Sequence, residues 1–193
     1  MDLPNDILWI IINRITQSDT EHDDRMAALA SCRLASHELS SLATPLFFSS
    51  IRLGRYNDTV ATSTKRAKKL DQMLTNSSNI AAWVKELALC LLYLSRQDSI
   101  TINLIATILH RLPHIRTFTL EGGDKIFRPR SNDLMSAIQA ICRSPYLTRL
   151  NLYRFGYFPV AIIAGCPNLR FLRLESCALL RVNAIFFSTF RKD

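Results

Sequence analysis

The sequence contains few of the residues on which common catalytic sites depend. Five glycines in 193 residues leave no glycine-rich loop of the kind that holds a phosphate group. The four histidines have no nucleophile pattern beside them, and Pro113 separates His110 from His114 and ends any helix that would align the two. We therefore expect no enzymatic activity and no metal or other cofactor.

Closely paired cysteines are also absent. Structural zinc sites usually have closely spaced ligands, and no CxxC pair is present. An odd number of scattered cysteines favours free, buried thiols in a reducing compartment over a disulfide framework. We therefore expect a protein of the cytoplasm, the nucleus or both. The five cysteines are Cys32, Cys90, Cys142, Cys166 and Cys177.

Long hydrophobic runs are absent as well. The longest, at 7–12 and 87–94, fall well short of the roughly 18 residues that a membrane-spanning helix needs. Asp2 and Asp6 stand where a secretory signal would carry basic residues. We expect no membrane partner and no secretion.

Charge is divided unevenly along the chain. Residues 1–40 hold seven acids and three bases, whereas the remainder holds nine acids and 21 bases, for a net charge of +8. The positive charge of the residues after 40 could favour an acidic partner or nucleic acid. Arginines dispersed over the surface are the alternative explanation of this charge. The bases are spread, and no aromatic residues interleave with the basic run at 65–69, which also fits the solvated face of a helix. Nucleic acid is therefore disfavoured as a partner.

Apolar residues at helical spacing predict three helices in the first 50 residues. The first, at 3–16, has Pro4 where a first-turn proline is tolerated, and it is apolar nearly all round, so we expect it to be covered on more than one side. A polar loop is expected at 17–24. A second helix then follows, and a third that ends at Pro45.

After residue 46, strand-like segments alternate with helical ones. Four segments share the template LxxLxL, in which L stands for any apolar residue and x for any residue. They begin 31, 32 and 22 residues apart, and Pro113, Pro145 and Pro167 precede three of them. A repeated strand–helix unit is typical of a solenoid, with an ordinary parallel α/β domain as the alternative. The template segments are 84–89, 115–120, 147–152 and 169–174, with a partial copy at 51–53 and helical patterns at 67–74, 102–109, 134–141 and 160–164.

Side chains alternate along a strand, so the template predicts which residues face outward. Read across the four segments, the outward rows are Glu86, Thr117, Arg149 and Phe171, then Ala88, Thr119, Asn151 and Arg173, then Cys90, Glu121, Tyr153 and Glu175. Arginine and tyrosine are enriched in protein interfaces, although an ordinary solvated sheet face is the alternative. The candidate substrate face consists of Arg149, Asn151, Tyr153, Phe171, Arg173 and Glu175.

Two N-terminal segments resemble the start and end of an F-box, the helical module that joins a protein to the Skp-type adaptor of an SCF ubiquitin ligase. The first is Leu3-Pro4-Asn5-Asp6-Ile7-Leu8 with the isoleucines that follow, and the second is Leu42-Ala43-Thr44-Pro45-Leu46-Phe47-Phe48. The family often has a basic residue at the position of His37 and a tryptophan at that of Leu39. The implied adaptor contacts are Leu3, Pro4, Ile7, Leu8, Ile11, Leu29 and Leu34.

The second part of the chain resembles the irregular leucine-rich repeats that accompany F-boxes. Residues 166–177 meet the LxxLxLxxC template in full, with Cys177 at the ladder position. The predicted fold class is thus α/β, with an F-box-like three-helix module at 1–50 and a leucine-rich-repeat-like solenoid with a short parallel sheet at 51–193. Because residues 184–193 follow a repeat directly and offer no polar cap, we expect a short or truncated member.

The resemblance implies a substrate-recognition subunit of an SCF-type E3 ligase. The F-box would bind the Skp-type adaptor and, through it, the cullin and RING subunits, and the repeats would bind an unknown protein substrate. The contribution to rate would be proximity. The alternative is a leucine-rich-repeat scaffold whose N-terminal helices only cap the solenoid.

Overall fold

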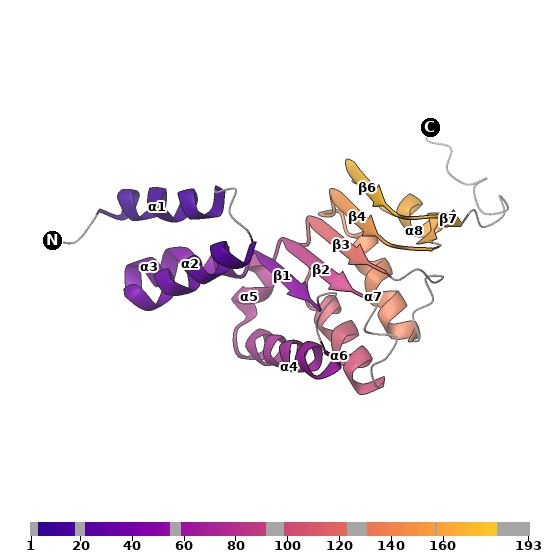
Figure 1. The fold of residues 1–193 in the computed structure, drawn as a ribbon, viewed down its shortest axis with the longest axis horizontal. Helices are drawn as coiled ribbons and strands as arrows, with labels where there is room; N and C mark the ends of the chain where they lie inside the picture. The colour runs from indigo at the N-terminus through magenta and orange to yellow at the C-terminus, as the bar shows by residue number, and fades with distance from the viewer. Residues whose placement is uncertain are drawn as a thin grey trace. The chain divides into compact units, whose positions relative to one another are not determined.

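The computed structural model describes residues 4–17, 22–54, 59–91, 99–122, 131–156 and 158–180 (Figure 1). The chain divides into two units, which are considered separately. Residues 1–51 are called the helical unit and residues 52–193 the repeat unit.

The helical unit contains α1 (Asn5–Gln17), α2 (His22–Ala35) and α3 (His37–Phe47). One residue from each helix is almost fully buried at its centre, namely Ile12, Leu29 and Ala43. Partly buried side chains, including Leu39 and Leu42, pack around these three. Three short helices thus share one small apolar core, as the periodicity of the sequence predicts.

Two helix ends in this unit differ from the prediction. The last residues of the expected loop form the first turn of α2, where the helix dipole stabilises the carboxylates of Asp23 and Asp24. Helix α3 does not end at Pro45 but runs through it to Phe47. A proline in the last turn removes only one helical hydrogen bond, and the Phe48 N–H still donates to the Thr44 carbonyl at 3.1 Å.

Helix α3 begins at a well-formed cap. The hydroxyl of Ser36 accepts a hydrogen bond from the Leu39 N–H at 3.2 Å, as a serine N-cap does. Hydrogen bonds from the Glu38 backbone N–H and from the Ser36 side chain lower the pKa of the Glu38 carboxyl. The cap fixes the short turn between α2 and α3.

A five-stranded sheet forms the centre of the repeat unit, and its strand order is β1-β2-β3-β4-β6. Consecutive strands are neighbours, the pairings from β2 to β6 are parallel, and helices follow the strands on one face of the sheet (Figure 1). The fold class is therefore α/β with a parallel sheet, as predicted. The strands are β1 (Ser50–Leu53), β2 (Glu86–Cys90), β3 (Thr117–Glu121), β4 (Arg149–Tyr153) and β6 (Phe171–Glu175).

The helices between the strands match the predicted helical patterns, with one addition. These are α4 (Val60–Asn76), α6 (Ser99–His110), α7 (Asn132–Arg143) and α8 (Val160–Ala164). The short helix α5 (Ser78–Trp83) was not predicted, nor was the two-residue parallel pair of β5 (Phe158–Pro159) and β7 (Leu179–Leu180). Elements this short contain too few residues to show a period.

Each strand begins two residues later than its template segment. The first apolar residue of the template, such as Ile115 or Leu147, is buried but lies in the turn before the strand. These turns stack on one another: the rings of His114 and Tyr146 meet edge to face at 4.8 Å, and the Asn168 side-chain amide donates to the Pro145 carbonyl at 2.8 Å. The repeated prolines therefore mark a real column of turns.

The predicted register across the sheet is confirmed. Thr117 lies beside Glu86 and Arg149, and Arg149 lies beside Phe171. The inward residues of β2, β3 and β4 are almost completely buried. These six residues, which form the centre of the core, are Leu87, Leu89, Phe118, Leu120, Leu150 and Leu152.

Three residues depart from this alternation. Cys90, predicted to face outward, is buried beside Gly54, where an added Cβ would lie only 3.4 Å from the Cys90 Cβ. Leu172 and Leu174, predicted to face inward, are 42% and 41% exposed. Their strand, β6, is the last in the sheet order, and only the short helix α8 precedes it.

Gly122 provides a test of packing at the end of β3. A Cβ atom at this position would lie 2.4 Å from the Phe155 ring, which is itself buried. We expect Gly122→Ala to lower the free energy of unfolding by about 1–3 kcal/mol, the usual cost of overpacking a core. Gly165→Ala is the matched control, since its Cβ would meet its neighbours at 3.4 Å. Equal urea midpoints for the two variants would contradict the expected clash.

Candidate protein-binding surfaces

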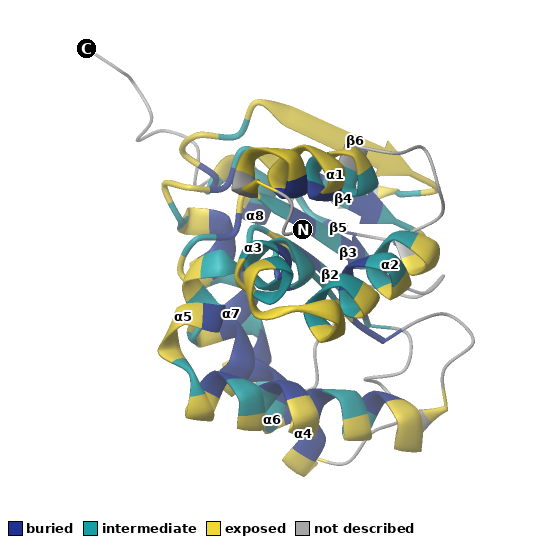
Figure 2. Ribbon diagram, turned by 90° about the vertical axis from the view of Figure 1, so that its left-hand side faces the viewer, coloured by how far each residue is buried: buried dark blue, intermediate teal, exposed yellow. Residues whose placement is uncertain are grey.

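The six residues of the candidate substrate face come together on two neighbouring strands. Strands β4 and β6 pair Arg149 with Phe171, Asn151 with Arg173, and Tyr153 with Glu175. All six side chains are exposed or half-buried. Strand β6 is exposed along its whole length (Figure 2), so a partner could reach these residues without displacing any described part of the repeat unit.

Contacts between the strands hold these side chains in place. The guanidinium carbon of Arg149 lies 5.2 Å from the centre of the Phe171 ring, and that of Arg173 lies 5.4 Å from the centre of the Tyr153 ring. Such cation–π contacts reduce the freedom of a long side chain while its N–H groups remain available. The candidate face is therefore partly ordered before any partner binds.

The face is hollowed between β4 and β6. An open hollow of about 500 Å³ is lined by Arg149, Asn151, Arg170, Phe171, Leu172 and Arg173, and is called the arginine hollow below. The side chain of Asn151 donates to the Thr119 hydroxyl at 3.0 Å, which fixes one wall. The sequence did not indicate Arg170 or Leu172, because strict alternation along the strand assigned neither to the outward face.

Helix α1 carries the second candidate surface. Pro4, Ile7 and Ile11 have the i, i+3, i+7 spacing of one helix side, and the two isoleucines are each 43% exposed. Ile10, beside them, is 50% exposed, while Leu8 and Ile12 face the core. The exposed side of α1 formed by Pro4, Ile7, Ile10 and Ile11 is called the α1 strip below. Trp9 is also exposed, on another side of the helix.

The other predicted adaptor contacts are distributed differently. Leu8 and Leu29 are buried, so they shape the core of the helical unit and offer no contact surface. Leu34 is 89% exposed near the end of α2. Leu3 lies outside the described residues. The helical period alone could not separate the core side of α1 from its exposed side, since both are aliphatic.

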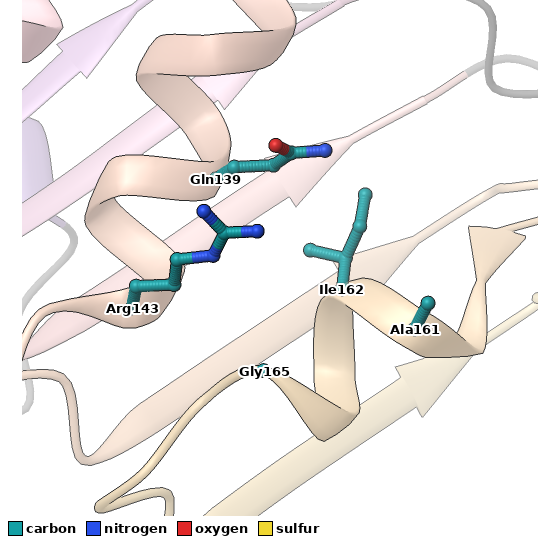
Figure 3. Close-up of a pocket in the computed structure, with 5 residues that line it drawn as sticks. All are labelled: Gln139, Arg143, Ala161, Ile162 and Gly165. Atoms are coloured by element: carbon teal, nitrogen blue, oxygen red, sulfur yellow. The ribbon is translucent and has the colours of Figure 1, made fainter. Parts of the chain in front are cut away.

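A smaller hollow of about 110 Å³ lies between α7 and α8 (Figure 3). Gln139 and Arg143 from α7 point toward Ile162 of α8 (Figure 3). Ligand pockets usually enclose roughly 300–1,000 Å³. This hollow is too small for an organic ligand, and we assign it no function.

The cysteines are all free thiols, and Cys90, Cys142 and Cys166 are buried. A hydrogen bond between the thiols of Cys142 and Cys166, together with burial, raises the pKa of Cys142. Within the described ranges, no group of three or more histidine, cysteine or acidic side chains is placed to hold a metal ion. In the same ranges, no helix has both the length and the apolar character needed to cross a membrane.

The chain was compared with protein-family models, with curated proteins and with solved structures, and no match to any of these was found. Any assignment of function must therefore be argued from the two surfaces and from the fold that carries them.

Proposed function

We propose that this chain is a substrate-recognition subunit of an SCF-type E3 ubiquitin ligase. In this proposal the helical unit is an F-box that binds a Skp-type adaptor, which connects it to the cullin and RING subunits. The repeat unit is a leucine-rich-repeat-like solenoid that binds a protein target in the cytoplasm or nucleus. The chain performs no bond chemistry itself and acts by holding the target close to the charged E2 enzyme.

The α1 strip is the observation that carries the proposal. Three of its aliphatic side chains remain 43–50% exposed although the same helix also supplies Leu8 and Ile12 to the core. Aliphatic residues at this spacing on an exposed helix are typical of a helix that docks into an apolar groove of a partner. The strip lies within the segment whose sequence resembles the start of an F-box.

Three further observations support the repeat part of the proposal. The strands of the sheet follow one another in chain order, and the column of proline turns repeats with them. The thiol of Cys177, at the ladder position of the template, lies 3.2 Å from two carbonyl oxygens that can accept its hydrogen bond, that of Leu152 in the preceding repeat and that of Glu175 in its own. Ladder residues of leucine-rich repeats satisfy backbone groups between repeats in this way.

Capture by the adaptor tests the proposal directly. We expect the purified chain to form a stoichiometric complex with a Skp-type adaptor, observed by size-exclusion chromatography with light scattering, and to co-precipitate cullin when the adaptor is present. No complex with the adaptor at micromolar concentrations of both proteins would refute the ligase role.

A leucine-rich-repeat scaffold without a ligase role is the second candidate. Leu39, which stands where F-boxes often have a tryptophan, is partly buried against the core of the helical unit. Its side chain therefore contributes to packing in this unit, as expected if the helices only cap the solenoid. Binding of a target by the repeat unit without any binding of the adaptor would favour the scaffold.

A further inference from the structure

The arginine hollow contains two cations without an internal counter-ion. Within the described ranges, no carboxylate pairs with Arg149 or with Arg170, and both residues are exposed. The third arginine, Arg173, is paired with Glu175 at 3.0 Å. The surface thus satisfies one of its three guanidinium groups with a carboxylate and leaves the other two available.

Apolar groups line the same hollow as these two cations. The Phe171 ring, 59% exposed, lies under the Arg149 guanidinium, and Leu172, 42% exposed, lines the same hollow. A ligand that fits would bring an anion for the arginines and an apolar side chain for the ring. A guanidinium that stacks on a ring and also pairs with a carboxylate is a frequent arrangement at protein interfaces.

The charges around the hollow limit the size of the anion. Glu121 and Glu175 lie on the same face, beside Tyr153 in the third outward row. Both carboxylates are already in ion pairs, Glu121 with Arg154 at 3.6 Å and Glu175 with Arg173 at 3.0 Å. Arg149 and Arg170 therefore offer positions for one or two carboxylates, which suits a short acidic stretch of polypeptide better than the long row of phosphates of a nucleic acid. The charge pattern therefore favours a peptide over a nucleic acid.

We propose that the arginine hollow binds an acidic segment of the target protein, with an aspartate or glutamate carboxylate on Arg149 and Arg170 and an aliphatic or aromatic side chain against Phe171. Carboxylates pair with guanidinium groups through two charge-assisted hydrogen bonds, which gives both affinity and orientation. This inference rests on the proposed role of the repeat unit in binding a protein target, and it assigns that target a chemical class.

A peptide array tests the inference without any adaptor. The full chain is applied to short peptides that are acidic with one leucine or phenylalanine, acidic without an apolar residue, neutral, basic or serine-phosphorylated. We expect retention chiefly by the acidic peptides that contain an apolar residue. No retention, or retention only by the phosphorylated peptides or by a single-stranded RNA probe, would overturn the assignment.

Two variants locate the site. For the best acidic peptide, we expect Arg149→Ala combined with Arg170→Ala to weaken binding about tenfold or more, because a hydrogen bond to a charged group contributes substantially to affinity. The matched control combines Lys68→Ala with Lys69→Ala, which removes the same charge from exposed positions of α4 and should leave binding unchanged. Equal losses in both variants would show non-specific attraction and overturn the inference.

Nuclear magnetic resonance supplies a local measurement. We expect the Nε–H signals of Arg149 and Arg170 to shift when the acidic peptide is added, while arginine signals of the helical unit stay unchanged. Because adaptor capture is measured separately, loss of adaptor binding with peptide binding retained would refute only the ligase role. The reverse result would refute only the acidic-segment assignment.

Discussion

Replacement of Ile7 and Ile11 by aspartate is expected to abolish capture by a Skp-type adaptor. Both side chains lie on the α1 strip and are 43% exposed, so carboxylates there remain solvated in the free protein and need not unfold the helical unit. Truncation of a central aliphatic anchor typically costs about 2 kcal/mol or more, and burial of a charge against an apolar groove adds to this cost. Two such changes should weaken binding by about a thousandfold or more.

Ile100→Asp is the matched control for this double variant. Ile100 is also an exposed isoleucine near the start of a helix, but it lies on α6 of the repeat unit. Its replacement should leave adaptor affinity unchanged. Isothermal titration calorimetry gives both affinities, and circular dichroism verifies the fold. Undiminished binding by a folded Ile7→Asp, Ile11→Asp variant would rule out the α1 strip as the contact surface.

Phe118→Ala is expected to destabilise the repeat unit by about 3–5 kcal/mol, the range found when a large aromatic is removed from a core. Phe118 is completely buried on β3, the middle strand of the sheet, between Leu87 and Leu150 on the adjacent strands. Its removal leaves a cavity that rigid neighbours on both sides cannot close. Since a domain is usually stable by only about 5–15 kcal/mol, the variant should be close to unfolding.

The two tryptophans allow this loss to be measured in the repeat unit alone. Trp9 lies in α1 and Trp83 in α5, so in a Trp9→Phe background the fluorescence during urea unfolding reports only on the repeat unit. Phe171→Ala, at an exposed phenylalanine of β6, is the control and should cost much less. Similar urea midpoints for the two variants would contradict the assignment of Phe118 to the centre of the core.

The sheet and its register could be predicted because the chain repeats its own pattern. Four copies of one template fix which residues lie side by side, so the sequence predicts that Arg149, Phe171 and their neighbours share one face, and the strand pairing confirms it. Periodicity is a reliable guide wherever one side of a strand is buried and the other is not.

The parts that were missed depend on position in the fold and not on pattern. Leu172 matches its template as well as Leu150 does, yet it is exposed because, among the described residues, β6 is the last strand of the sheet and only the short helix α8 precedes it. Arg170 lines the arginine hollow from just before β6, where alternation along a strand does not apply. Leu8 and Ile7 are equally apolar, and only the packing of α1 on α2 and α3 decides which of them is buried.

The consecutive strand order also has a consequence for how the repeat unit comes apart. Within the five-stranded sheet, each strand is bonded only to the strands of that sheet that come before and after it along the chain, so the cooperativity of the sheet is transmitted from neighbour to neighbour. Local unfolding of β6, whose residues are all exposed, need not disturb β2 and β3, whereas the arginine hollow is lined by residues from both β4 and β6. A target bound in the hollow would contact both strands, so binding would be coupled to the local stability of this edge of the sheet.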